Sequence, residues 1–186
     1  KLWLCWWLKV TKGKRVNIFA KRIYFCSIYL YIYGEKWWKV VKSPIFIGEY
    51  RHNLDVKGRL AIPANFRDAL GLHFYAAVGL DKCVSLYTEE QFSLLYEQLL
   101  AYPDTKKNSR SLMQQIMGQA GKCEPDSQGR VMLPANLIRY AGLQKDCAVV
   151  GVGNHVEIWD GSIWEERSEE TLSNLSDIAE NLPELH

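Results

Sequence analysis

Metal-binding and disulfide patterns are missing from this sequence of 186 residues. Its five cysteines are scattered, odd in number and without a C-x-x-C pair, and its four histidines show no metal-ligand spacing. This distribution disfavours a disulfide framework and a structural zinc site, and it favours a reducing cytosol. We interpret these side chains as ordinary packing or surface residues, and we expect no cofactor.

Catalytic motifs are missing as well. The chain contains no G-x-S-x-G, no H-E-x-x-H, no Walker loop and no pair of carboxylates at a useful spacing. Gly151-x-Gly153 resembles part of a dinucleotide fingerprint, but a strand pattern continues past it and no helix follows, so it predicts a hairpin turn. We therefore expect a protein that is not an enzyme.

The sequence contains no long apolar run, and its charge is unevenly distributed along the chain. The most apolar stretch, residues 23–33, has 11 residues, whereas a membrane-spanning helix needs about 20, so no membrane partner is expected. Residues 1–44 hold ten Lys or Arg and one acid, which leaves 13 basic and 20 acidic residues in 45–186. Nucleic-acid binding by this second part requires a local basic cluster, because its average field repels phosphate.

Residues 1–44 differ in composition from the rest of the chain. They contain eleven aromatic residues and no methionine, and the first methionine is Met113. Basic residues interleaved with aromatics are typical of segments that bind single-stranded nucleic acid by stacking, and attachment to a membrane is a further alternative. We favour the hypothesis that this atypical leader lies upstream of the true start and is not normally translated, because it shows no folding period.

After residue 45 the chain contains two copies of one pattern. LDVKGRLAIPANF at 54–66 aligns with PDSQGRVMLPANL at 125–137 at an offset of 71. Each copy places Asp at the first and Gly at the fourth position of a predicted type I turn, followed by arginine. Around this turn the pattern predicts two strands, then a short helix opened by proline and then a hairpin: 48–54, 59–62, 64–70 and 74–87 in the first copy, with a helix over 135–141 and a hairpin over 147–159 in the second.

Helices are predicted to join the copies and to follow them. Thr88-x-x-Gln91 is a capping box, and a further helix is predicted over 108–118 with Leu112 and Ile116 inward; both helices are expected to serve packing. The acidic tail is predicted as a solvated helix or a frayed end. The predicted organisation is a leader at 1–44, modules at 49–96 and 120–163, linking helices at 97–119 and a tail at 164–186.

The repeated turns carry the candidate binding residues. Arginine presents a rigid fork of donors that suits phosphate oxygens or the major-groove edge of guanine. The alternative is that aspartate and arginine pair within each turn and bind no ligand. Both interpretations stay open from the residues alone: we expect exposed tips, with Lys57, Arg59 and Arg130 as the candidate binding residues and Asp55, Gly58, Asp126 and Gly129 as the turn-forming residues.

The motifs FIGEYRHNLDVKGRLAIPANFR, DSQGRVMLPANLIRYAGLQKD and EIWD resemble the MraZ family of bacterial regulators over about residues 45–166. The resemblance implies an α+β fold in which two tandem AbrB-like β-hairpin and short-helix modules form a pseudo-two-fold β-barrel, with linking and C-terminal helices. The family begins with methionine where this chain has Ile45, so we expect the native polypeptide to start there.

The resemblance also implies a cytoplasmic, nucleoid-associated transcriptional regulator. It implies a ring-shaped homo-oligomer that binds double-stranded DNA at short direct repeats upstream of its own operon, in the division and cell-wall gene cluster. By this analogy Arg59 and Arg130 face the DNA with Lys57 beside Arg59, and Gln128 leaves the second turn weaker in charge. An AbrB-like protein-interaction or antitoxin-type module that does not bind repeats is the alternative.

Overall fold

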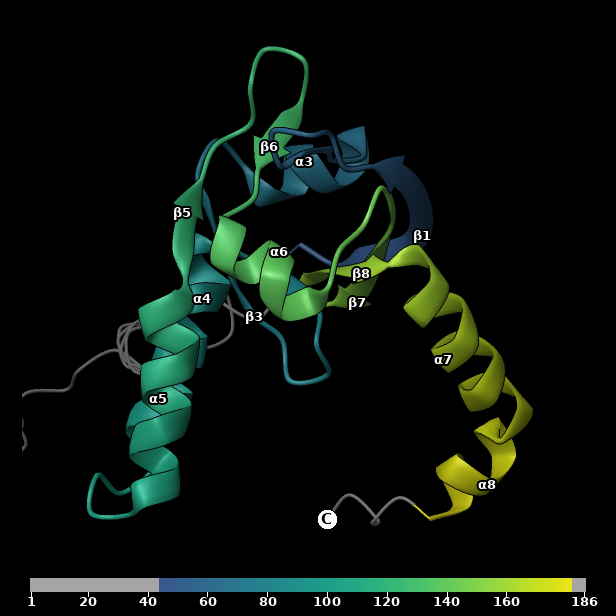
Figure 1. The fold of residues 1–186 in the computed structure, drawn as a ribbon. Helices are drawn as coiled ribbons and strands as arrows, with labels where there is room; N and C mark the ends of the chain where they lie inside the picture. The colour runs from purple at the N-terminus through teal and green to yellow at the C-terminus, as the bar shows by residue number, and fades with distance from the viewer. Residues whose placement is uncertain (1–43, 182–186) are drawn as a thin grey trace, which may run out of the picture. The chain divides into compact units, whose positions relative to one another are not determined.

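An antiparallel sheet accompanied by helices organises residues 44–181, the part of the chain that the computed structural model describes (Figure 1). The expectations for residues 1–43 lie outside this range. The elements are, in chain order, β1 (Phe46–Asn53), β2 (Arg59–Ala61), α3 (Ala64–Leu70), β3 (Phe74–Val78), β4 (Val84–Thr88), α4 (Glu89–Leu100), α5 (Lys107–Gln119), β5 (Gly121–Cys123), β6 (Arg130–Met132), α6 (Ala135–Ala141), β7 (Asp146–Gly153), β8 (Val156–Asp160), α7 (Gly161–Ser173) and α8 (Leu175–Glu180). The predicted α+β class is confirmed, and the predicted strands and helices are found with boundaries shifted by a few residues.

Strands from the two sequence copies are interleaved in the main sheet. Its order is β1-β7-β8-β4-β3-β5, so that β1 of the first copy pairs with β7 of the second, and β5 of the second pairs with β3 of the first. The two predicted hairpins, β3–β4 and β7–β8, form as expected and meet at the centre, where Ser85 lies opposite Glu157. Each copy therefore completes the sheet of the other.

The predicted β-barrel is not closed, because the main sheet is open. Strands β2 and β6 pair with each other in a separate two-stranded ribbon. Only single bridges, Leu54↔Leu60 and Pro125↔Val131, connect each of these strands to the segment before its own turn. Since β2 and β6 use their backbone groups on one another, they do not extend the ladder between the edge strands β1 and β5.

The main core lies between the sheet, the β2–β6 ribbon and the two short helices. Alternation along each strand sends every second side chain inward, and Leu60 faces Val131 across the ribbon with no exposed surface on either. Phe66 of α3 makes edge-on aromatic contacts with Phe46 and Tyr50 of β1. Other buried members include Ile62, Leu70, Phe74, Leu86, Leu133, Leu137, Val149, Val156 and Ile158.

The linking helices pack as predicted. The Gln91 backbone N–H donates to Thr88 Oγ1 at 3.2 Å, which confirms the helix start at the capping box. Leu99 of α4 and Ile116 of α5 are buried against Ala77 of β3. These helices are therefore tied to the sheet through a small apolar cluster of their own.

The C-terminal segment is helical, with α7 starting on the Asp160 carboxylate, which accepts the Ser162 N–H. Trp164 packs against Trp159, and Arg167 lies over the Trp159 ring at 5.1 Å. Residues 169–181 are exposed, in agreement with the predicted solvated helix. Within residues 44–181, no helix combines the length and the apolar character that crossing a membrane requires.

Candidate nucleic-acid interface

The first repeated turn is organised around the carboxylate of Asp55. The Gly58 N–H donates to the Asp55 carbonyl at 2.9 Å, as a type I turn requires. Asp55 Oδ1 accepts the backbone N–H groups of Lys57 and Arg59 at 2.8 and 2.9 Å. Its Oδ2 accepts the Nε–H of Arg59 at 2.7 Å. One side chain thus fixes both the path of the turn and the direction of the arginine.

The second turn has the same construction. Its backbone closes through the Gly129 N–H to the Asp126 carbonyl at 2.9 Å, and Asp126 Oδ1 accepts the N–H groups of Gln128 and Arg130, both at 2.9 Å. Asp126 Oδ2 accepts Nε and Nη2 of Arg130 at 3.0 and 2.8 Å. Asp126 thus organises the second turn through the same set of hydrogen bonds that Asp55 uses in the first.

Glycine is required at the fourth position of each turn. Gly58 and Gly129 have φ values of +76° and +73°, a left-handed conformation that other residues rarely adopt. Space is restricted too: a Cβ on Gly58 would come within 3.0 Å of Ile138 Cδ1, and one on Gly129 would overlap the guanidinium of Arg67. The glycines therefore allow both the bend and the close approach of a neighbour.

The arginines are less exposed than the sequence led us to expect. Arg59 and Arg130 retain 28% and 31% of their side-chain exposure, because each lies against its aspartate. Lys57 is exposed at the tip, as expected. Each Asp–Arg pair is neutral as a unit, so the Nη groups are pre-oriented for hydrogen bonding without adding net charge to the turn.

Each turn is buttressed by the other copy of the repeat. The Leu133 N–H donates to the Gly58 carbonyl at 2.9 Å, and the Ile62 N–H donates to the Gly129 carbonyl at 3.1 Å. Likewise Ile138 of α6 lies against the first turn and Arg67 of α3 lies against the second. The sequence analysis did not identify either side chain. Their positions differ by 71, the same offset that relates the two turns, and this offset could have identified them as equivalent positions.

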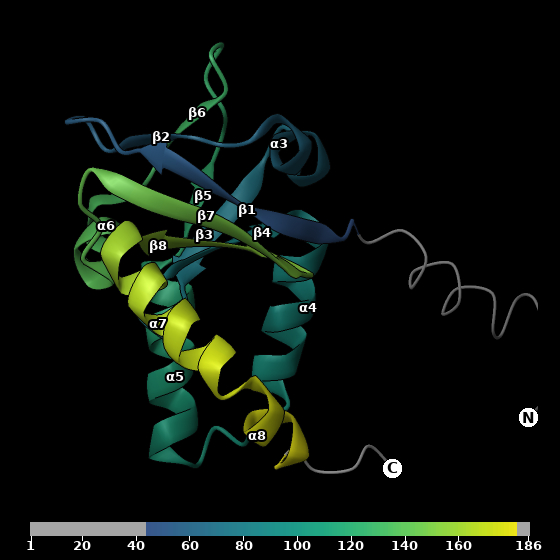
Figure 2. The ribbon, with the colours of Figure 1, turned by 90° about the vertical axis from the view of Figure 1, so that its right-hand side faces the viewer.

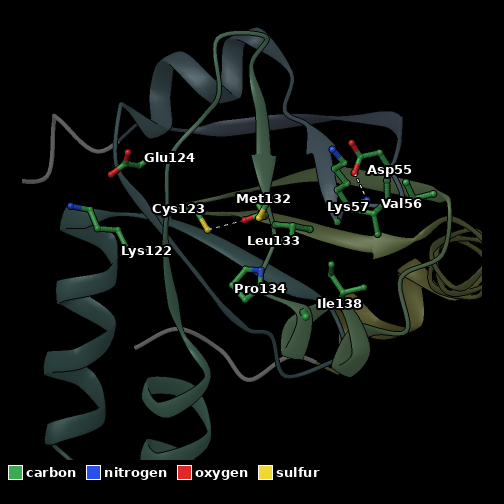
Figure 3. A pocket seen from close by; sticks show the side chains of 13 residues that line it. Asp55, Val56, Lys57, Lys122, Cys123, Glu124, Met132, Leu133, Pro134 and Ile138 are labelled. Atoms are coloured by element: carbon green, nitrogen blue, oxygen red, sulfur yellow. Dashed lines mark hydrogen bonds between the residues drawn. The ribbon is translucent and has the colours of Figure 1, made fainter.

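A groove of about 850 Å³ borders the first turn. Figure 3 shows Lys57 and Val56 on one side of it, and Pro134 and Ile138 on another. Lys122 of β5 also lines it, beside Glu124. The exposed tip of the first turn thus stands over a mixed apolar and basic surface that belongs to the second copy.

Both turns lie on the same side of the unit. Figures 1 and 2 show the loops that precede β2 and β6 on the side away from the α4–α5 loop and α8, although the two loops point in different directions. Residues 45–186 carry net negative charge. A phosphate backbone can therefore approach them most favourably where basic groups gather.

The geometry lowers the pKa of both turn carboxyls. The backbone N–H of Arg59 is the main cause at Asp55, with the Arg59 side chain and the Lys57 N–H adding to it. The pKa of Asp126 is lowered in the same way, mainly by the backbone N–H of Arg130, with the Arg130 side chain and the Gln128 N–H adding to it. Hydrogen bonds to the ionised form favour that form, so the ionised carboxylates stabilise the fold above the usual aspartate pKa of about 3.9, and this stabilisation is lost as pH falls through and below that value.

We predict that acid removes this contribution from both turns. The double variant Asp55→Asn, Asp126→Asn should be less stable than the wild type at pH 6. The difference should narrow as pH falls below about 4, because the unfolded chain then takes up protons that the folded carboxyls, with their lowered pKa, take up only at lower pH. Urea unfolding at fixed protein concentration measures the difference at each pH. Asp104→Asn, at an exposed position without a side-chain acceptor role among the described residues, is the control and should match the wild type throughout. A gap that stays constant down to pH 3 would contradict the prediction.

Known proteins share this pattern. A family model described as "MraZ protein, putative antitoxin-like" matches residues 45–115 and again residues 116–184. The protein named transcriptional regulator MraZ from Pediococcus pentosaceus is 46% identical over 138 residues, which cover 74% of this chain and 96% of that protein. Proteins of the same name from Ligilactobacillus salivarius and Lactiplantibacillus plantarum are 45% identical over 138 residues, covering 74% of this chain and 96% and 98% of theirs. The two tandem matches fall on the two copies of the repeated turn, and the chain belongs to the MraZ family.

Proposed function

We propose that this protein is a transcriptional regulator that binds double-stranded DNA through its two D-x-x-G-R turns. The observation that carries the proposal is the duplicated geometry: each turn holds its arginine on an aspartate in the same way, and the loops that precede β2 and β6 both lie on the side away from α8 (Figure 2). Such forks suit phosphate oxygens and the guanine edge. The names of the relatives, which call them transcriptional regulators, support the same function.

The two copies act in this proposal as AbrB-like modules, 49–96 and 120–163, related by a local two-fold axis. The ribbon register supports the relation, because Arg59 pairs with Met132 and Ala61 pairs with Arg130 around the central pair Leu60↔Val131. The strand order of the main sheet also reads the same from either edge when each strand is exchanged for its counterpart. Each subunit would then offer two equivalent contacts to DNA.

The target we propose is a set of short direct repeats upstream of the protein's own operon, bound by a ring of subunits in the nucleoid. Exposed apolar side chains on α4, α7 and α8 support self-association, since they find no cover among residues 44–181: Leu94, Leu100, Leu172, Leu175 and Ile178. A ring that engages several repeats at once gains about 10²–10⁴ in avidity over a single contact. This gain in avidity explains how residues 45–186 can bind DNA tightly although their net charge is negative.

The decisive experiment measures binding to the protein's own upstream DNA. Fluorescence anisotropy should show tighter binding to a duplex with two or more direct repeats than to a duplex with one, and weak binding to a scrambled duplex of equal length. Light scattering on the same sample should give a mass several times that of one chain. Equal binding to all three duplexes would contradict repeat recognition, and a monomer that binds repeats tightly would contradict the ring.

A role as an antitoxin-type module for protein interaction is the second candidate. The family description and the exposed apolar residues of α7 and α8 favour it. A catalytic role is not proposed, because the carboxylates of Asp55 and Asp126 are already engaged by backbone and arginine donors. The protein-interaction module is supported instead if the folded protein binds none of the duplexes.

A further inference from the structure

Arg67 of α3 lies against the second turn, although it belongs to the first copy of the repeat. Its guanidinium occupies the space where a Cβ on Gly129 would stand. The side chain is half-buried. The backbone carbonyl of Gly129 accepts the N–H of Ile62, which lies between β2 and α3, so a nearby hydrogen bond ties the start of the helix to the turn.

Arg67 differs from the turn arginines because its charge is not paired with a carboxylate in the described part of the chain. Arg59 and Arg130 form ion pairs with Asp55 and Asp126 at 2.7 and 2.8 Å. Among residues 44–181, no hydrogen bond or ion pair is formed by the Arg67 side chain; the arginine ion pairs involve Arg51, Arg59, Arg130 and Arg167. Its charge is therefore available to a ligand, although the group is held in place by packing.

The two turns differ in which residue supplies a cation without an ion-pair partner among the described residues. At the first turn the uncompensated cation is Lys57, at the exposed tip. At the second turn the tip residue is Gln128, and the position that corresponds to Arg67 beside the first turn is the apolar Ile138. Each turn therefore has one neutral Asp–Arg pair and, beside it, a cation without an ion-pair partner within residues 44–181: Lys57 at the first turn and Arg67 at the second. Lys122 lines the groove beside the first turn as well.

We propose that Arg67 is a phosphate-binding residue of the second turn, replacing in trans the lysine that Gln128 lacks. This inference rests on the proposed DNA-binding function and adds a residue to its site. A held guanidinium suits this role because arginine binds phosphate oxygens with two parallel donors. Each turn of one subunit then presents a cation without an ion-pair partner in the described structure, in addition to its Asp–Arg pair, which the tip sequences by themselves do not predict.

The test compares salt dependence for two variants, with a duplex carrying the upstream repeats. Arg67→Gln should reduce the slope of log affinity against log salt by about one for each contacting subunit, as loss of one phosphate contact requires. Lys57→Gln should reduce it by a similar amount. At 0.1 M salt, a slope change of one corresponds to a loss of about tenfold per contact. Arg110→Gln, on α5 far from the turns, removes the same charge and should leave the slope unchanged.

Two further variants separate a charge effect from a packing effect. Arg67→Lys keeps the cation and should retain the wild-type slope, and Gln128→Lys in the Arg67→Gln background should restore it by placing a lysine at the tip, as in the first turn. Circular dichroism and urea midpoints check that each variant is folded. Failure of both variants to keep or restore the slope would overturn the inference in favour of a purely structural Arg67.

The same titration keeps the inference distinguishable from the function on which it rests. If the wild type binds the repeats and Arg67→Gln retains the full slope while Lys57→Gln loses part of it, the role of Arg67 is overturned and the DNA-binding function stands. If the wild type does not bind the duplex, the proposed function itself is overturned, and the inference with it.

Discussion

Replacing Arg59 and Arg130 together by alanine is expected to abolish specific binding to the upstream repeats. Each arginine that reads a base or phosphate contributes about 1–3 kcal/mol, so two lost contacts per subunit weaken binding by at least about 30-fold. The real loss should be larger, because each substitution also leaves a carboxylate unpaired beside the DNA. What was a neutral pair becomes a negative charge that repels phosphate.

Fluorescence anisotropy with the repeat-bearing duplex measures this loss, and a variant of equal charge change provides the matched control. Lys107→Ala with Arg110→Ala removes two cations at the start of α5, on the side away from the turns (Figure 1). The control should bind like the wild type within a few-fold. The turn aspartates still accept backbone N–H groups in the double arginine variant, so it should remain folded. A folded variant that binds the repeats normally would show that both arginines only stabilise their turns.

The largest effect on stability is expected for Leu60→Ala. Leu60 is fully buried opposite Val131 at the centre of the β2–β6 ribbon, and truncating such a leucine costs about 2–5 kcal/mol. Both turns depend on this ribbon, since Leu133 and Ile62, the residues just beyond it, donate the N–H groups that the carbonyls of Gly58 and Gly129 accept. DNA binding should therefore weaken along with stability, although Leu60 has no exposed surface.

Met132 supplies the control for Leu60, because it lies on the facing strand but points to solvent, with 61% exposed. Met132→Ala should change the free energy of unfolding by about 0.5 kcal/mol or less. Urea unfolding of both variants at one protein concentration checks the difference, since assembly makes the apparent stability depend on concentration. Similar losses in the two variants would mean that the ribbon is not the centre of the core.

Local features of this fold could be predicted because their causes lie within a few residues. The turn residues Asp55 and Gly58 define a hydrogen-bonded loop of four residues, and Thr88 caps a helix through a residue three positions later. Alternating apolar residues located the β3–β4 hairpin. Repetition at a fixed offset identified two equivalent units, and the family resemblance then indicated their function.

Pairing between the copies could not be predicted in the same way. That β1 joins β7 and that β2 joins β6 depends on contacts between residues roughly 70 to 100 positions apart, for which the local pattern contains no partner information. The predicted barrel does not close for this reason: strands can be located from local patterns, but the partners of β2 and β6 decide whether the sheet closes.

The sequence by itself determined the two turns, the arginine that follows each, and the asymmetry between Lys57 and Gln128. The pairing of each arginine with the aspartate four residues before it is local, and the sequence left it as one of two alternatives. Only the tertiary structure decided that Arg67 reaches the second turn from the first copy. The physical reason is that the charge available at a surface depends on which side chains are paired in space. The approach of Arg67 is set by long-range packing of the ribbon and helices, and by the bare Cα of Gly129, which leaves room for a side chain from the other half of the chain.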